Sequence, residues 1–114
     1  MTDIRVYGKS TCKTTQKVLE WLTDHKVEID YVDIISSPPT SEFLQKNIHS
    51  DNLKTYLNSR SKIYREKSFG VNLPSKEEAI SMMLEDPNLI KRPLIVSSKG
   101  VSFGFDDDYL NELA

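Results

Sequence analysis

The N-terminal third of the chain alternates between strand and helix patterns. In residues 3–7 ("DIRVY"), Ile4 and Val6 alternate with more polar neighbours, which is typical of a strand that buries one face. Residues 12–25 then place apolar side chains at helical spacing and predict an amphipathic helix. A run rich in β-branched and aromatic residues follows at 27–35 ("VEIDYVDII"). This order predicts a β-α-β unit with parallel strands and a right-handed crossover.

The middle of the chain has helical periodicity. The motif "SSPPT" breaks the strand pattern, and apolar residues keep helical spacing across residues 40–85. A capping box at Ser75 and Glu78 opens the last helix of this segment, and Asp86, which precedes a proline, closes it. We therefore expect a mostly helical middle segment.

The C-terminal part returns to strand patterns and ends in a helix. Residues 94–97 and 101–105 form two apolar runs around a turn that contains Lys-Gly, which predicts a hairpin. Asp106 is expected to cap a terminal helix with an acidic first turn. The whole order, β-α-β, helices and then β-β-α, predicts an α/β fold with a mixed four-stranded sheet and helices packed on it.

Composition excludes several classes of protein. The chain has 114 residues, of which 38% are hydrophobic, so we expect one domain with one core. The 15 Lys and Arg residues against 17 Asp and Glu residues give a net charge of -2, which argues against nucleic-acid binding. No run approaches the roughly 18 apolar residues of a membrane span, and the N-terminus lacks the apolar region of an export signal.

The only cysteine, Cys12, is either a structural residue or a nucleophile. A single cysteine cannot form a disulfide within the chain, so we expect the reducing cytoplasm as its compartment. Lone cysteines are often buried and inert. Cys12, however, directly follows a β-to-α turn with Ser10 and Thr11, at a helix N-terminus where unpaired N–H groups and the helix dipole favour an anion.

The neighbours of Cys12 favour a thiolate and limit its chemistry. Lys9 and Lys13 add positive charge, and the Thr15 hydroxyl can donate a hydrogen bond to the sulfur. Thr15 also stands where a dithiol motif has its second cysteine, so catalysis would be monothiol. An external thiol, such as glutathione or a thioredoxin-like or glutaredoxin-like partner, would then complete the cycle through a mixed disulfide. Val18 stands where a Cys-x5-Arg phosphatase loop has its arginine, which excludes that chemistry.

Three segments together resemble the ArsC/Spx family. They are "YGKSTCKTTQKVLEWL", "YLNSRSKIYREKS" and "LIKRPLIVSSKGVSFGF", in this order along the chain. The resemblance implies a thioredoxin-like (glutaredoxin-like) mixed four-stranded sheet with a helical insertion in the middle of the chain. It covers residues 1–114 as a single domain, with a thioredoxin-like core at 1–35 and 88–114 and the insertion at 40–86.

The resemblance also implies a site. Cys12 resembles the nucleophilic cysteine of the family, and Pro93 resembles the cis-proline that faces this thiol. Arg92 resembles the arginine with which arsenate reductases hold an oxyanion, and Arg60 falls near a second arginine of similar role.

Simpler interpretations of these residues remain open. Arg60 and Arg92 could be surface cations, and Pro93 could be a trans proline that begins an edge strand. Lys9, Ser10 and Thr11 would contact an anionic substrate near Cys12 or form a plain polar turn.

The chain differs from both characterised branches of the family. Gly104-Phe105 stands where the related arsenate reductases carry a further arginine, and Thr15 replaces the second cysteine of the Spx regulators. We therefore expect a monothiol, glutaredoxin-like oxidoreductase with glutathione as co-substrate, no bound cofactor and no metal. The alternatives are an Spx-like regulator that binds RNA polymerase without enzymatic chemistry, and a family member that has lost its reactivity.

Overall fold

The computed structural model describes residues 3–114, which form two compact units. The first, which we call the sheet unit, contains the chain up to Asp33 and again from Arg92 onward. The second, the helical unit, is Ile34–Lys91. The single domain with residues 40–86 as an insertion stays a prediction.

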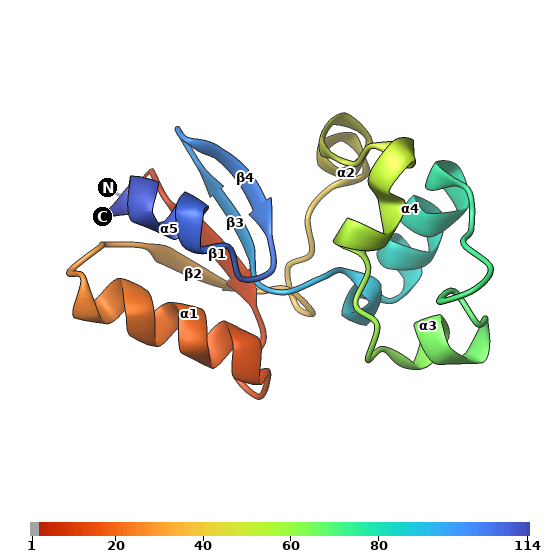
Figure 1. Cartoon of the computed structure of the whole chain (residues 1–114), viewed down its shortest axis with the longest axis horizontal. Coiled ribbons are helices and arrows are strands. Elements are labelled where there is room, and N and C mark those ends of the chain that lie inside the picture. Colours follow the sequence, from red (N-terminus) through yellow and green to blue (C-terminus); the bar gives the residue numbers. More distant parts are fainter. Residues whose placement is uncertain (1–2) are drawn as a thin grey trace. The chain divides into compact units, whose positions relative to one another are not determined.

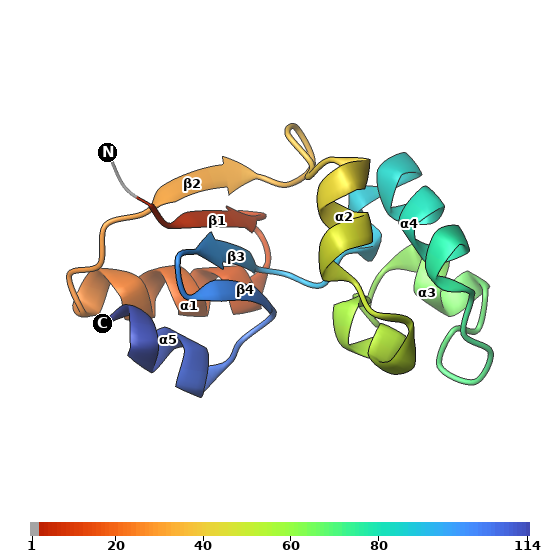
Figure 2. The ribbon, with the colours of Figure 1, turned by 90° about the horizontal axis from the view of Figure 1, so that it is seen from above.

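Four short strands form the sheet of the first unit (Figure 1). They are β1 (Arg5–Gly8), β2 (Asp30–Asp33), β3 (Leu94–Ser97) and β4 (Gly100–Phe103). Figure 2 shows them side by side in the order β2-β1-β3-β4. β1 pairs with β2 in parallel, whereas the pairs β1–β3 and β3–β4 are antiparallel. The predicted mixed four-stranded sheet and its C-terminal hairpin are therefore confirmed.

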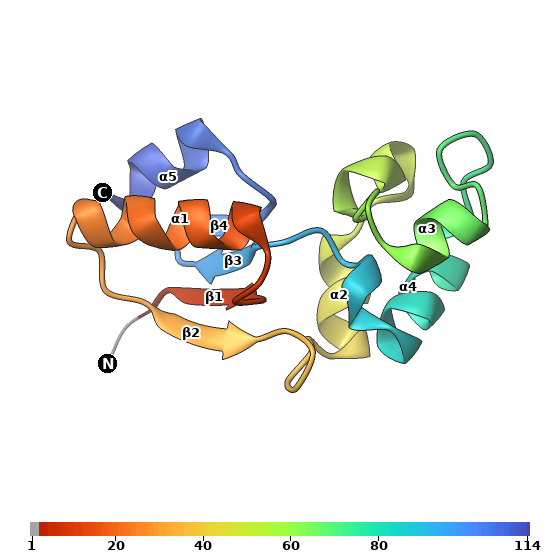
Figure 3. The ribbon, with the colours of Figure 1, turned by 90° about the horizontal axis from the view of Figure 1, so that it is seen from below.

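Two helices bury one face of this sheet. They are α1 (Lys13–Asp24) and α5 (Asp107–Leu113), and Figure 3 looks onto them from the side that they cover. The core between helices and strands consists of Val6, Val18, Leu22, Ile95, Tyr109 and Leu110. Asp106 caps α5 as predicted, because its Oδ1 accepts a hydrogen bond of 3.2 Å from the Tyr109 N–H. The same periodicity that predicted these helices thus provides the apolar side chains of the core.

Several element boundaries differ from the sequence prediction for physical reasons. The second strand, expected over residues 27–35, is only Asp30–Asp33, because pairing with β1 begins at Asp30 opposite Arg5. The last strand begins at Gly100 and ends at Phe103, because Gly104 has a φ of 89° and turns the chain away.

The helical unit confirms the predicted helical character of the middle segment. Its elements are α2 (Ser41–Asn47), η1 (Ser50–Tyr56), α3 (Lys62–Glu66), α4 (Lys76–Glu85) and η2 (Pro87–Leu89). Ser75 caps the start of α4 as predicted, since its Oγ accepts from the Glu78 N–H at 3.2 Å, and the Glu78 side chain folds back to accept from the Ser75 hydroxyl at 3.2 Å. Within residues 3–114, no helix has the length and apolar character needed to cross a membrane.

Candidate functional site

Cys12 occupies the N-cap of α1, directly after the turn that follows β1. Its backbone is extended, with φ -82° and ψ 121°, so the predicted helix begins one residue later, at Lys13. The Cys12 N–H donates to the Lys9 carbonyl at 2.9 Å, and its own carbonyl accepts from the Gln16 N–H at 3.0 Å. The thiol is half-buried and is not part of a disulfide. The turn and the first helical turn therefore fix the sulfur where solvent still reaches it.

The surroundings of Cys12 lower the pKa of its thiol. Partial burial alone would raise this pKa, because it disfavours the charged form. The backbone N–H and the hydroxyl of Thr15, the positive charge of Arg92 and the backbone N–H of Thr14 act in the opposite direction, and together they outweigh the burial. The lowering therefore involves Arg92, whereas the sequence pointed to the charges of Lys9 and Lys13. A lowered pKa gives a larger thiolate fraction at neutral pH, and the thiolate is the nucleophilic form.

Thr15 is oriented toward the sulfur by the strand beside it. It is completely buried in the first turn of α1, and its Oγ1 accepts a hydrogen bond of 3.4 Å from the Lys9 N–H. Since an N–H occupies the acceptor side of the oxygen, the hydroxyl proton is left to donate to the thiolate. A Cβ placed on Gly8 would lie 2.5 Å from Thr15 Cγ2, so only glycine at the end of β1 leaves room for this threonine. Sequence reasoning missed this role of Gly8.

Loss of the Thr15 hydroxyl should raise the pKa of Cys12. Thr15→Val keeps the shape of the side chain but removes the donor, so the alkylation rate with iodoacetamide at pH 7 should fall by about threefold to tenfold. Thr15→Ser keeps the hydroxyl and serves as the matched control. A valine variant whose pH–rate profile coincides with that of the wild-type protein would contradict the role assigned to this hydroxyl.

Arg92 and Pro93 precede β3 in the same unit. The Arg92–Pro93 peptide bond is cis, as predicted, and Pro93 is buried. Arg92 is half-buried with its Nε inaccessible to solvent, and its positive charge acts on Cys12. The structure thus brings Cys12, Thr15 and Arg92 to one site.

Tyr31 on β2 is a neighbour of this site that sequence reasoning missed. Burial, the charge of Asp33 and the charge of Cys12 raise the pKa of its phenol, and the charge of Arg92 lowers it. The side chain remains 40% exposed. The signal that could have found it is its position on β2, which runs parallel to β1, the strand that leads into the turn before Cys12.

The other predicted residues have different surroundings. Lys9 is half-buried, whereas Ser10 and Thr11 are exposed in the turn before Cys12. The Ser10 carbonyl accepts from Gln16 Nε2 at 2.6 Å, so this turn is held by its backbone. Arg60 belongs to the helical unit, where it is exposed and its N–H donates to Asn58 Oδ1 at 3.0 Å. The predicted roles of these residues and of Pro93 in binding stay predictions.

Metal ions have no evident site in the described part of the chain. Among residues 3–114, no group of three or more His, Cys, Asp or Glu side chains is arranged to hold a metal ion. His25 instead lies at the C-terminus of α1, where its Nδ1 lies 2.8 Å from the Trp21 carbonyl and its ring stacks on the Trp21 indole at 3.8 Å.

The chain is similar to several known proteins. The uncharacterized protein YusI of Bacillus subtilis is 32% identical over 110 residues, which are 93% of either chain. The global transcriptional regulator Spx 1 of Lactococcus lactis is 28% identical over 107 residues, which are 92% of this chain and 84% of the regulator. The crystal structure of a possible arsenate reductase from Streptococcus mutans superposes with a TM-score of 0.83 at 25% identity and covers 98% of both chains.

These matches extend over nearly the whole chain and bear out the predicted thioredoxin-like fold class. The sequence profile of the ArsC family matches residues 7–113, from the end of the first strand through the last helix. The chain therefore belongs to the ArsC family.

Proposed function

We propose that the protein is a monothiol, glutaredoxin-like oxidoreductase that acts through Cys12 and glutathione. The observation that carries this proposal is the half-exposed Cys12 thiol at the N-cap of α1, whose pKa is lowered by Thr15, Arg92 and Thr14. A structural cysteine would need none of these groups, whereas a nucleophilic cysteine needs a thiolate that solvent and substrate reach. Because the chain has one cysteine, its partner in exchange must come from outside.

Two exchange steps complete the proposed cycle. The Cys12 thiolate attacks the glutathione sulfur of a glutathionylated substrate; the new S–S bond joins Cys12 to glutathione, and the substrate leaves as a thiolate that takes up a proton. A reduced glutathione thiolate then attacks the glutathione sulfur of this mixed disulfide. Glutathione disulfide forms, and the Cys12 thiolate is released. The substrate is reduced to its thiol, and its glutathione unit leaves joined to the one reduced glutathione that the cycle consumes, as glutathione disulfide.

The cationic and polar residues around Cys12 would bind the anionic part of the substrate. In this proposal Arg92 holds a glutathione carboxylate or another oxyanion, because a guanidinium presents fixed bidentate donors. Lys9, Ser10 and Thr11 in the turn and Pro93 before β3 contribute further contacts. Arg60 is the second candidate for the carboxylate.

Arsenate is the less favoured oxyanion. Gly104, where related arsenate reductases have an arginine nearby, is buried and has a φ of 89°, and its N–H donates to the Pro93 carbonyl at 2.8 Å. A side chain at this position would be strained. The geometry around Gly104 therefore disfavours an arginine at this position, which is our reason for ranking arsenate second.

Incubation of the reduced protein with glutathione disulfide tests the proposal. Intact-mass measurements over a pH series should show one glutathione per chain, at an apparent pKa below that of a free thiol, and reduced glutathione should reverse the addition. A Cys12 that stays unmodified, or that reacts only at alkaline pH, would contradict the proposal.

Arg92 should also select anionic reagents. Arg92→Leu should slow the reaction of Cys12 with anionic iodoacetate more than the reaction with neutral iodoacetamide, and change the ratio of the two rates by about threefold to tenfold. Arg65→Leu, which removes an exposed arginine of the helical unit, is the control and should leave this ratio unchanged. Equal slowing of both reagents by Arg92→Leu would show that the arginine acts only through the thiol.

A regulatory role is the second candidate, because several relatives are named global transcriptional regulator Spx. In that case the chain would bind RNA polymerase in the cytoplasm without thiol chemistry. Copurification with polymerase distinguishes the two proposals: the Cys12→Ser variant should still bind polymerase if the protein is a regulator.

A further inference from the structure

Helix α4 of the helical unit has two different faces. Ala79, Ile80 and Met83 are buried on one of them. The opposite face presents Glu78, Ser81, Met82 and Glu85, which recur at the i, i+3, i+4, i+7 spacing of a single helix face. Of these, only Met82 is half-buried, and the others are exposed. An apolar side chain is thus set between two carboxylates on a surface that the core of this unit does not use.

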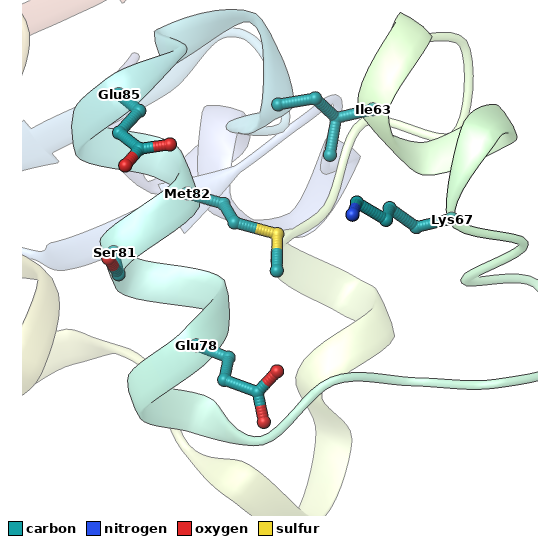
Figure 4. A pocket seen from close by; sticks show the side chains of 6 residues that line it. All are labelled: Ile63, Lys67, Glu78, Ser81, Met82 and Glu85. Carbon is teal, nitrogen blue, oxygen red and sulfur yellow. The ribbon is translucent and has the colours of Figure 1, made fainter.

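A cavity of about 340 Å³ lies between this face and α3. Figure 4 shows Met82 pointing from α4 toward Ile63 on α3 and toward Lys67, which directly follows α3. Ile63 is half-buried like Met82, and the stem of Lys67 adds apolar surface to the same wall. We call this cavity the α3–α4 groove. Its volume is at the lower end of the range of about 300–1,000 Å³ for ligand pockets, which suits one or two side chains better than a large cofactor.

The charges of the α3–α4 groove favour a basic ligand. Glu78 and Glu85 stand on either side of Met82, and Lys67 is the one cation among the lining residues. Glu78 is held in place because it accepts a hydrogen bond of 3.2 Å from Ser75 Oγ. The two glutamates are seven positions apart on the helix, so their Cα atoms lie about 10 Å apart along its axis. Two cations at this separation, with an apolar side chain between them, would match the groove.

We propose that the α3–α4 groove binds an extended peptide segment of a partner protein with the pattern basic-x-apolar-x-basic. In an extended chain alternate side chains point to the same side, and residues four apart are separated by about 13 Å. Both basic side chains therefore reach Glu78 and Glu85 while the central leucine or methionine packs against Met82 and Ile63. This proposal is independent of Cys12 and of the proposed thiol chemistry.

Titration of the full chain with short peptides tests the groove directly. The probe is the capped peptide Lys-Ser-Leu-Ser-Lys, and the signal is the methyl group of Met82 in protein labelled with [methyl-¹³C]methionine. The Met82 signal should shift saturably with a Kd of about 0.1–1 mM, while that of the buried Met83 stays in place. The acidic peptide Glu-Ser-Leu-Ser-Glu should bind at least about tenfold more weakly, because its carboxylates are repelled by those of Glu78 and Glu85.

Two matched charge reversals locate the binding. Glu85→Lys lies at the end of α4 and Glu112→Lys in the last turn of α5, so both place a cation where a helix dipole favours it. Glu85→Lys should raise the Kd of the basic peptide by at least about fivefold, and Glu112→Lys should raise it by less than about twofold. The absence of a saturable shift, equal binding of both peptides, or equal weakening by both variants would overturn the proposal. So would a Met82 signal that shifts with protein concentration alone, since a second copy would then occupy the groove.

Discussion

The Cys12→Ser variant is expected to lose all exchange with glutathione disulfide and to remain folded. A hydroxyl cannot form the mixed disulfide, so no glutathione should be added at any pH. Serine is a favoured residue at a helix N-cap, and the position is half-buried. At a pH where the Cys12 thiol is protonated, the free energy of unfolding should therefore change by no more than about 0.5 kcal/mol. Intact mass and urea unfolding measure the two effects.

The control for this experiment is Thr14→Ser, which keeps the backbone N–H that lowers the pKa of Cys12. Its exchange rate should stay within about twofold of the wild-type rate, since the change removes only one methyl group from a half-buried side chain. Glutathione addition to the Cys12→Ser variant would place the reaction elsewhere in the chain and refute the assignment.

The wild-type protein and the Cys12→Ser variant should differ in how their free energy of unfolding depends on pH. The folded chain lowers the pKa of Cys12, so the unfolded chain binds more protons between the two pKa values. The stabilisation that the thiolate contributes is therefore present above the pKa of the unfolded chain, which is about 8.5, and is lost as the pH falls through the pKa of the folded chain. The difference in unfolding free energy, wild type minus Cys12→Ser, should rise with pH; a flat or falling difference would contradict the lowered pKa.

The Gly8→Ala variant is expected to destabilise the sheet unit and to deactivate the thiol together. The added methyl group would lie 2.5 Å from Thr15 Cγ2 and 3.0 Å from Thr15 Oγ1, and Thr15 is completely buried. Overpacking of this kind costs about 1–3 kcal/mol. Relief of the clash moves Thr15 away from the strand, so its hydroxyl leaves the sulfur and the pKa of Cys12 rises. Urea unfolding and the pH dependence of alkylation would report both effects.

Two further variants make the Gly8→Ala experiment decisive. Gly70→Ala is the control, because the nearest atom to its new methyl group is Tyr64 Oη at 3.7 Å, an ordinary contact. Adding Thr15→Ser to Gly8→Ala removes the clashing Cγ2 and keeps the hydroxyl, so stability should recover in part. If Gly8→Ala were as stable as Gly70→Ala, the proposed close approach of β1 and α1 would be refuted.

Local signals in the sequence predicted local features of the structure. The cap residues Ser75 and Asp106 were predictable because a cap acts on N–H groups two or three residues away. The same reasoning pointed to Thr15 as the partner of Cys12, since both lie in one helical turn. The hydrophobic periodicity indicated the helices and strands, although their ends depend on pairing and turns that the pattern does not contain.

Features that depend on distant parts of the chain were not visible in the pattern. The approach of Arg92 to Cys12 could be anticipated only from the family resemblance, because the helical unit separates the two residues in sequence. Tyr31 joins the site through the parallel pairing of β2 with β1. Thr15 excludes any side chain larger than that of glycine at position 8. This exclusion depends on distances of tenths of an ångström between packed atoms, which a residue pattern does not contain.

The order of the strands has a consequence during synthesis on the ribosome. β1 lies between β2, which follows soon after it, and β3, which comes only after the whole of Ile34–Lys91. Until β3 emerges, one edge of β1 has no neighbour, and Arg92, whose charge lowers the pKa of Cys12, has yet to arrive. A nascent or truncated chain therefore lacks the share of Arg92 in the lowered pKa of Cys12, and this share is added only when the C-terminal strands close the sheet.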